Sequence, residues 1–108
     1  MPKLVVVSTT VSDGEQADKM AGAILSSALG ACVQTSEVIS RYFWEGKLCE
    51  EKEFLLQVKT TELCANKLQE FITANHPYKV PEVLVFPVIS ASASYAKWVS
   101  EQISPEFS

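Results

Sequence analysis

The chain has 108 residues, of which 47% are hydrophobic and 20% are charged. This is the length of one domain, spanning residues 1–108, and the composition of a folded globular protein rather than a disordered one. The net charge of −4 lacks the basic surplus that binding to a phosphate backbone needs, so we expect no nucleic acid partner. Apolar runs such as residues 4–7 and 83–86 are far shorter than the roughly 20 residues that cross a bilayer, and residues 1–9 do not resemble a secretory signal. We therefore expect a cytoplasmic protein that does not bind membranes.

The first part of the chain predicts a strand followed by a helix. Residues 3–9 (KLVVVST) are mostly β-branched and apolar, as in a strand that is buried on both faces. Ser12 and Glu15 have the spacing of a capping box. Apolar residues then recur every three or four positions, which predicts an amphipathic helix, and Gly30 is placed to end it.

A long β-hairpin is predicted next. Residues 31–44 and 48–60 are rich in β-branched and aromatic residues, and they flank the turn signal at residues 45–47. Strands in globular domains usually run about five or six residues, so two arms of roughly a dozen residues would project beyond a small domain. We expect a partner chain to pair with their ends.

The second half of the chain adds a helix, a strand and a helix. An amphipathic helix is predicted at residues 63–72, capped by Thr60 or Thr61. A buried strand is predicted at residues 83–89 and a short helix at residues 95–103. The resulting order is β-α-β-β-α-β plus one helix. This order is typical of the ferredoxin-like α+β fold, in which two helices cover one face of an antiparallel sheet.

The only histidine, His76, is the first candidate for a functional residue. It lies in residues 75–82 (NHPYKVPE), where two prolines favour a rigid turn. A lone histidine in a loop is more often a hydrogen-bonding residue than a metal ligand, and copper and zinc sites need several nitrogen or sulfur donors. Nearby cysteines or carboxylates, or residues from neighbouring chains, would have to complete a metal site.

The remaining reactive residues point to no enzyme. The cysteines at positions 32, 49 and 64 form no C-x-x-C pair and are expected to be reduced; Cys64 falls on a core-facing stripe, whereas Cys32 is open to other roles. The aromatic residues 42–44 favour packing against a neighbouring subunit over stacking on a ligand, and the charge run at residues 50–53 is expected to be a solvated or interchain-paired face. The sequence has no nucleophile elbow, phosphate loop, zinc-protease or dinucleotide motif.

Several motifs make the sequence resemble the CutA family, which is named for divalent-cation tolerance. They are residues 31–33 (ACV), 42–47 (YFWEGK), 59–60 (KT) and 76–82 (HPYKVPE), together with Pro87, Tyr95 and Trp98. The resemblance implies a ferredoxin-like subunit in a tight homotrimer, whose sheets join edge to edge through the long hairpin arms. In assembly this is similar to the PII signalling proteins, and it agrees with the overlong arms.

The resemblance also implies two kinds of site. Some bacterial members are credited with a metal site made of a cysteine and two adjacent histidines; the matching residues here are Ser8, Asn75 and His76, so only His76 carries over as a metal ligand. A pocket between subunits is the second feature. Its lining residues are all present in this sequence, namely Cys32, Trp44, Lys59, Tyr78 and Glu82.

Two functional hypotheses follow from these residues and the resemblance. The first is a non-enzymatic CutA-like homotrimer that takes part in divalent metal ion (copper) tolerance and homeostasis. It would bind copper or zinc through His76, with Cys32 or Glu82, and need no obligatory cofactor. The second is a PII-like regulatory or scaffold trimer whose intersubunit pocket binds a small anion or a partner, with Lys59 supplying the positive charge.

Overall fold

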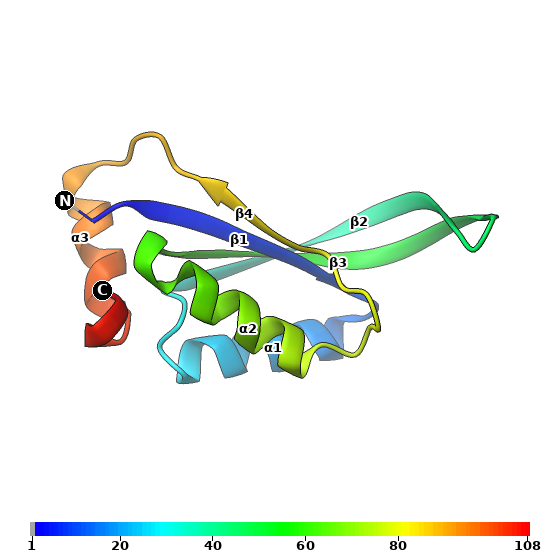
Figure 1. Cartoon of the computed structure of the whole chain (residues 1–108), viewed down its shortest axis with the longest axis horizontal. Helices are drawn as coiled ribbons and strands as arrows, with labels where there is room; N and C mark the ends of the chain where they lie inside the picture. Colours follow the sequence, from blue (N-terminus) through cyan, green and yellow to red (C-terminus); the bar gives the residue numbers. More distant parts are fainter. Residues whose placement is uncertain (1) are drawn as a thin grey trace.

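A computed structural model describes residues 2–108 and has the predicted order of elements. The elements are β1 (Leu4–Val11), α1 (Gly14–Ser26), β2 (Cys32–Trp44), β3 (Lys47–Thr61), the 3₁₀ helix η1 (Glu62–Cys64), α2 (Ala65–Asn75), β4 (Val83–Pro87), α3 (Ala93–Gln102) and the 3₁₀ helix η2 (Pro105–Phe107). The four strands form one antiparallel sheet in the order β2-β3-β1-β4, and α1 and α2 lie on one face of it (Figure 1). The predicted α+β ferredoxin-like arrangement is therefore confirmed.

The hydrophobic core lies between the two helices and the sheet. Its fully buried side chains include Val7, Ile24, Leu56, Leu68 and Ile72. They come from both central strands and from both helices, so the apolar stripes of α1 and α2 are buried as their periodicity predicted. This burial is the main force that holds the helices on that face.

The helix α1 begins with a different cap from the predicted one. The side chain of Asp13 is the N-cap and accepts a hydrogen bond of 2.8 Å from the backbone N–H of Gln16. The side-chain oxygen of Gln16 in turn accepts a bond of 3.3 Å from the N–H of Ser12. The capping pair is thus Asp13 and Gln16 rather than Ser12 and Glu15, because two overlapping capping patterns occur one residue apart.

The prediction that Gly30 ends α1 is wrong. The helix ends at Ser26, and Ala28 adopts the left-handed conformation with φ of 58°. A Cβ atom at Gly30 would lie 2.5 Å from Cγ1 of Val58 and 2.8 Å from Cγ2 of Ile24. Gly30 therefore lets the backbone pass close to β3, where a side chain would collide with the core.

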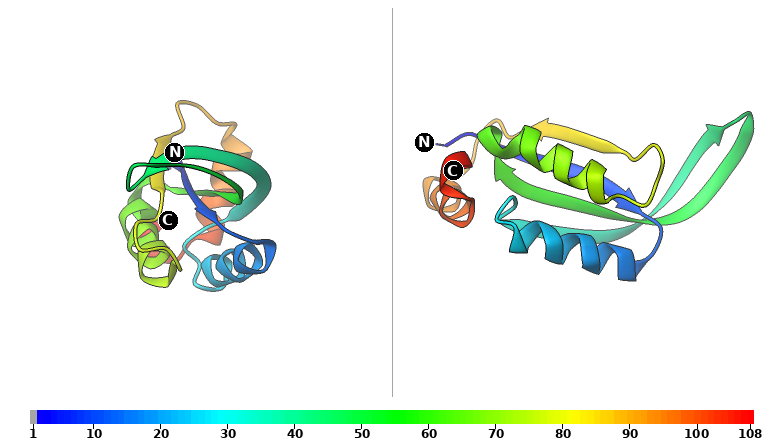
Figure 2. Two further views of the ribbon diagram at one scale, coloured as in Figure 1. Left: turned by 90° about the vertical axis from the view of Figure 1, so that its right-hand side faces the viewer. Right: turned by 60° about the horizontal axis from the view of Figure 1, so that its bottom comes forward.

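The long hairpin is confirmed. β2 and β3 pair along the whole of β2, around a two-residue turn in which Glu45 (φ 51°) and Gly46 (φ 77°) both have positive φ, as hairpin turns of this length require. β1 pairs with β3 only as far as Phe54. The outer half of the hairpin consequently projects and curves away from the rest of the molecule (Figure 1, Figure 2). The whole molecule, hairpin included, is 46 Å long.

Two surfaces of the sheet have the character of interfaces. Within residues 2–108, β2 and β4 each have a strand neighbour on one side only, so both sheet edges present unpaired backbone groups. Large apolar side chains are also exposed: Phe86 on β4 is 48% exposed, and Phe43 and Leu48 near the hairpin tip are 75% and 69% exposed. Open edges and exposed apolar side chains are typical of surfaces that bind another chain.

Candidate functional site

His76 follows α2 directly, and both nitrogens of its ring are hydrogen-bonded. Nδ1 accepts a bond of 3.0 Å from the backbone N–H of Tyr78, so the ring hydrogen lies on Nε2, which donates to the carbonyl oxygen of Thr10 at 2.9 Å. Burial lowers the pKa of His76, against the smaller raising effects of the Thr10 carbonyl and the Glu53 carboxylate. The neutral ring therefore pins the loop after α2 to the end of β1.

This geometry limits His76 as a metal ligand. A metal ion binds an imidazole through a free lone pair, and the lone pair of Nδ1 is already used by the N–H of Tyr78. Coordination through His76 requires the turn at residues 76–78 to open. Across residues 2–108, no group of three or more His, Cys, Asp or Glu side chains is placed to hold a metal ion. Among the described residues, His76 therefore has no ready-made set of such co-ligands within one copy.

Tyr78 fixes the same loop to the hairpin. Its phenol donates a hydrogen bond of 2.7 Å to Oε2 of Glu53 on β3, and its ring packs at a tilt on His76, with centroids 4.8 Å apart. Glu53 is only 6% exposed. Burial of the phenol and its bond to the Glu53 carboxylate both raise the pKa of Tyr78. The loop is therefore held rigidly against the base of the outer hairpin.

Between this loop and the hairpin lies a cavity of about 800 Å³, which we call the hairpin cavity. It is lined by Thr10, Ser40, Arg41, Tyr42, Trp44, Cys49, Glu51, Glu53 and residues 78–82. The phenol of Tyr42 donates a bond of 2.8 Å to Glu51, and this bond to a carboxylate raises the pKa of Tyr42 to about 12. The cavity thus combines aromatic rings with carboxylates that are oriented by neighbouring phenols.

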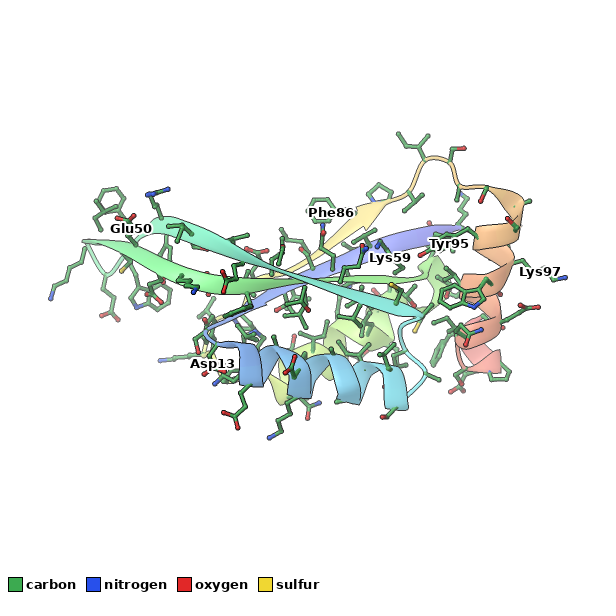
Figure 3. All side chains as sticks on the ribbon, turned by 180° about the vertical axis from the view of Figure 1, so that it is seen from behind. Asp13, Glu50, Lys59, Phe86, Tyr95 and Lys97 are labelled. Atoms are coloured by element: carbon green, nitrogen blue, oxygen red, sulfur yellow. The ribbon has the colours of Figure 1, made fainter. Side chains whose placement is uncertain are left out.

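Three of the five predicted pocket residues line the hairpin cavity, namely Trp44, Tyr78 and Glu82. The other two, Cys32 and Lys59, face each other across β2 and β3 at the opposite end of the sheet. Figure 3 shows Lys59 beside Tyr95 at that end, whereas Glu50 lies at the other end, near the hairpin tip. The structure therefore splits the predicted pocket into two separate parts.

The distance from Cys32 to Trp44 follows from the length of β2. This strand has 13 residues and runs from Cys32 to Trp44, so at about 3.3 Å per residue its ends lie roughly 40 Å apart. Lys59 donates a hydrogen bond to the side chain of Gln34 and lines a smaller cavity of about 270 Å³ together with Tyr95. Within one copy of the chain, no small ligand can therefore touch both Cys32 and Trp44.

Sequence reasoning missed Glu51 and Glu53 as lining residues, because they lie within an apparently uniform charge run. Residues 50–53 belong to β3, so successive side chains of the run point to opposite faces of the sheet. Glu51 and Glu53 line the cavity, whereas Glu50 and Lys52 do not. Each of these two forms an exposed cross-strand ion pair, Glu50 with Arg41 at 3.0 Å and Lys52 with Glu37 at 3.1 Å. Alternation along a strand was the signal that could have separated the two sets.

Known proteins resemble this chain over most of its length. A family model described as "CutA1 divalent ion tolerance protein" matches residues 5–102. The "Divalent-cation tolerance protein CutA" of Thermus thermophilus is 39% identical over 97 residues, which are 89% of this chain and 94% of that protein. The solved structure of CutA from Synechococcus elongatus PCC7942 has a TM-score of 0.92 and 34% identity, and the match covers 96% of this chain and 93% of that one.

Plant relatives are longer than this chain. "Protein CutA 1, chloroplastic" of Oryza sativa is 41% identical over 96 residues, which are 88% of this chain but 54% of that protein. The chain spans about half the length of such relatives. Names of similar proteins place them in different compartments, since another solved structure is that of a periplasmic CutA from Archaeoglobus fulgidus. In residues 2–108, no helix has the length and apolar character needed to span a bilayer.

Proposed function

Because this chain belongs to the CutA1 divalent ion tolerance protein family, we propose that it contributes to divalent-cation tolerance by binding copper or zinc ions as a homotrimer. The proposed role is that of a binding protein in the cytoplasm, with no catalytic step and no obligatory cofactor. The family model and the relatives support the link to divalent cations. The metal, the trimer and the compartment are parts of the proposal.

One observation carries the proposal: the five predicted pocket residues are too far apart to share one pocket within a single copy. Cys32 and Lys59 lie roughly 40 Å, one length of β2, from Trp44. A pocket that contains all five predicted residues can therefore form only if the Cys32 end of one copy meets the hairpin cavity of another. Oligomerisation is then a condition for function rather than a by-product of it.

The sheet offers the surfaces that such an assembly needs. The edges of β2 and β4 are open, and strands of neighbouring copies can extend the sheet there. Phe86 and the apolar residues near the hairpin tip would be covered in the same contact. A closed ring of three copies satisfies every such edge, as cyclic symmetry does in most oligomers. This is the PII-like assembly that the resemblance implies.

Metal ions are the proposed ligands of the completed pocket. One copy lacks a group of three donors among residues 2–108, but Cys32 and Glu82 would come together from different copies. A thiolate and a carboxylate are both ligands of zinc, and a thiolate favours copper. His76 joins them only if it gives up its bond from Tyr78, so we expect its contribution to be small.

The regulatory alternative has less support. A small anion was expected to bind through Lys59, but this side chain already donates to Gln34. Glu51, Glu53 and Glu82 line the hairpin cavity to which Lys59 would be added. These carboxylates would repel an anion, so the wall of the pocket favours a cation.

Calorimetric titration with Cu(II) and Zn(II) tests the proposed function. We expect saturable binding by the metal-free oligomer and a clear loss of affinity in Cys32→Ser and in Glu82→Gln. Glu70→Gln on the exposed side of α2 is the matched control, since it removes the same charge away from the pocket. Equal heats for the wild type and for all three variants would refute the proposed metal site.

A further inference from the structure

The wall of the hairpin cavity is predominantly negative. Glu51, Glu53 and Glu82 line it, together with the cationic residues Arg41 and Lys79. Arg41 is neutralised by its ion pair of 3.0 Å with Glu50, so the carboxylates outnumber the remaining positive charge. The volume of about 800 Å³ lies within the usual range for small-molecule sites, about 300–1,000 Å³. The cavity is thus suited in size and charge to a small organic cation.

Two of the carboxylates have a defined spacing and orientation. Glu51 and Glu53 lie on the same face of β3, two residues apart, so their backbone positions are about 7 Å from each other. Each accepts one hydrogen bond from a phenol, Glu51 from Tyr42 and Glu53 from Tyr78. A carboxylate has about four acceptor positions, so each keeps the capacity to bind a further donor. Glu53 is only 6% exposed, so its remaining acceptor positions are largely shielded from bulk solvent.

This spacing does not suit a bare metal ion within one copy. The oxygen ligands of a divalent cation must lie within about 2.0–2.6 Å of it, and residues 2–108 contain no group of three side chains placed to do so. Two carboxylates on backbone positions about 7 Å apart instead match a ligand whose positive charges are separated by a short chain. Protonated amines at both ends of an alkyl chain have this form.

Aromatic rings complete the match. Tyr42, Trp44 and Tyr78 line the same cavity, and aromatic faces attract ammonium groups and cover methylene groups. We propose that the hairpin cavity binds a linear aliphatic polyamine, with one ammonium group at Glu51, another at Glu53, and the alkyl chain against the aromatic rings. The proposal builds on the proposed function in that it assigns a ligand class to the same pocket, but it requires no metal ion.

Titration with spermidine and putrescine in the presence of EDTA tests this assignment. Trp98→Phe serves as the background, because Trp44 is then the only tryptophan and its fluorescence reports on the cavity. We expect saturable changes in Trp44 fluorescence with both amines and none with 1,4-butanediol, which has the length of putrescine without its charges. Glu51→Gln and Glu53→Gln should each weaken spermidine binding about tenfold, the effect of losing one charge-assisted bond.

Glu70→Gln is the control for charge alone, since it changes the net charge equally and lies on the outer side of α2. It should leave the affinity for spermidine unchanged. Glu51 is exposed, so Glu51→Gln tests the inference even if Glu53→Gln fails to fold. A lack of saturable binding by the wild type, or equal losses in Glu70→Gln and Glu51→Gln, would overturn the assignment.

The polyamine site and the proposed metal site can be disproved independently of each other. Spermidine binding in EDTA, without heats from Cu(II) or Zn(II), would sustain the polyamine site and refute the metal site. Metal binding that depends on Cys32 and Glu82, without a response to amines, would do the reverse. A neighbouring copy that fills the cavity would also prevent the response to amines, and this result counts against the inference.

Discussion

The phenol of Tyr78 donates a hydrogen bond of 2.7 Å to Oε2 of Glu53, which links the loop after α2 to the projecting half of the hairpin. Because Glu53 is 6% exposed, its carboxylate has little access to water if this donor is removed. The bond therefore both shapes the hairpin cavity and stabilises the fold. It is also the contact that places an aromatic ring beside a carboxylate in that cavity.

Tyr78→Phe should lower the free energy of unfolding by about 1.5–3 kcal/mol, the range for loss of a hydrogen bond to a charged group. Tyr42→Phe is the matched control, because Tyr42 makes the same kind of bond to Glu51 but is exposed. That change should cost much less, because solvent competes for the exposed bond. Urea unfolding at one protein concentration measures both, and equal costs would show that burial of Glu53 is unimportant.

The neutral ring of His76 predicts a pH dependence of stability. Burial holds the pKa of His76 in the folded chain below its ordinary value of 6.5, so the unfolded chain binds the proton first as the pH falls. The stability that the neutral ring contributes is therefore complete above pH 6.5 and is lost between 6.5 and the lower pKa of the folded state.

Unfolding of the wild type and of His76→Gln should be compared at pH 7.5 and in steps below 6.5. The difference in free energy between the two proteins should shrink as the pH falls, because the variant lacks the titrating ring. A difference that grew with acidity would mean that the folded state prefers the charged ring. The hydrogen bond accepted by Nδ1 would then be wrongly assigned.

Substitution by alanine should have opposite effects on stability at Gly22, within α1, and at Gly30, after its end. Gly30→Ala places a methyl group 2.5 Å from Val58 and should destabilise the fold by about 1–3 kcal/mol. Gly22 lies on the exposed side of α1 with nothing within 4 Å of an added Cβ, so Gly22→Ala should stabilise by about 0.5–1 kcal/mol. Thermal unfolding distinguishes the two, and a neutral Gly30→Ala would contradict the close approach to β3.

Phe86 should matter for assembly although it contributes little to the core of one copy. It is 48% exposed and lies on β4, at an open edge of the sheet (Figure 3). Phe86→Asp should convert the proposed homotrimer into smaller species in light scattering at micromolar concentration. Leu25→Asp is the control, because Leu25 is 47% exposed but lies on α1. If Leu25→Asp dissociated the protein and Phe86→Asp did not, the contact surface would lie on the helices.

The sequence predicted the sheet, its helices and the hairpin because each depends on local periodicity and turn chemistry. The predicted strands, residues 31–44 and 48–60, match the observed hairpin to within one residue at every end, since its turn requires positive φ at Glu45 and Gly46. The role of Gly30 was missed because its constraint comes from Val58, 28 positions later along the chain. Such a contact leaves no local pattern.

The candidate site was predicted less completely for the same reason. Trp44, Tyr78 and Glu82 were expected from motifs of the family and do line one cavity. Both ring nitrogens of His76 are occupied by hydrogen bonds, to the Thr10 carbonyl and from the Tyr78 N–H. The bond to Thr10 forms because the loop after α2 lies against the end of β1, and such a long-range contact has no signature in the sequence.

Cross-linking between Cys32 and Cys49 tests the central claim most directly. Cys49 lines the hairpin cavity, whereas Cys32 lies at the other end of the sheet, roughly 30 Å away along the strands. Mixed ¹⁴N- and ¹⁵N-labelled protein, treated with a short bismaleimide and analysed by mass spectrometry, should yield Cys32–Cys49 peptides that join differently labelled copies, and Cys49→Ser should abolish them. A protein that remains monomeric at micromolar concentration and yields no such mixed-label peptide would contradict a pocket completed between copies.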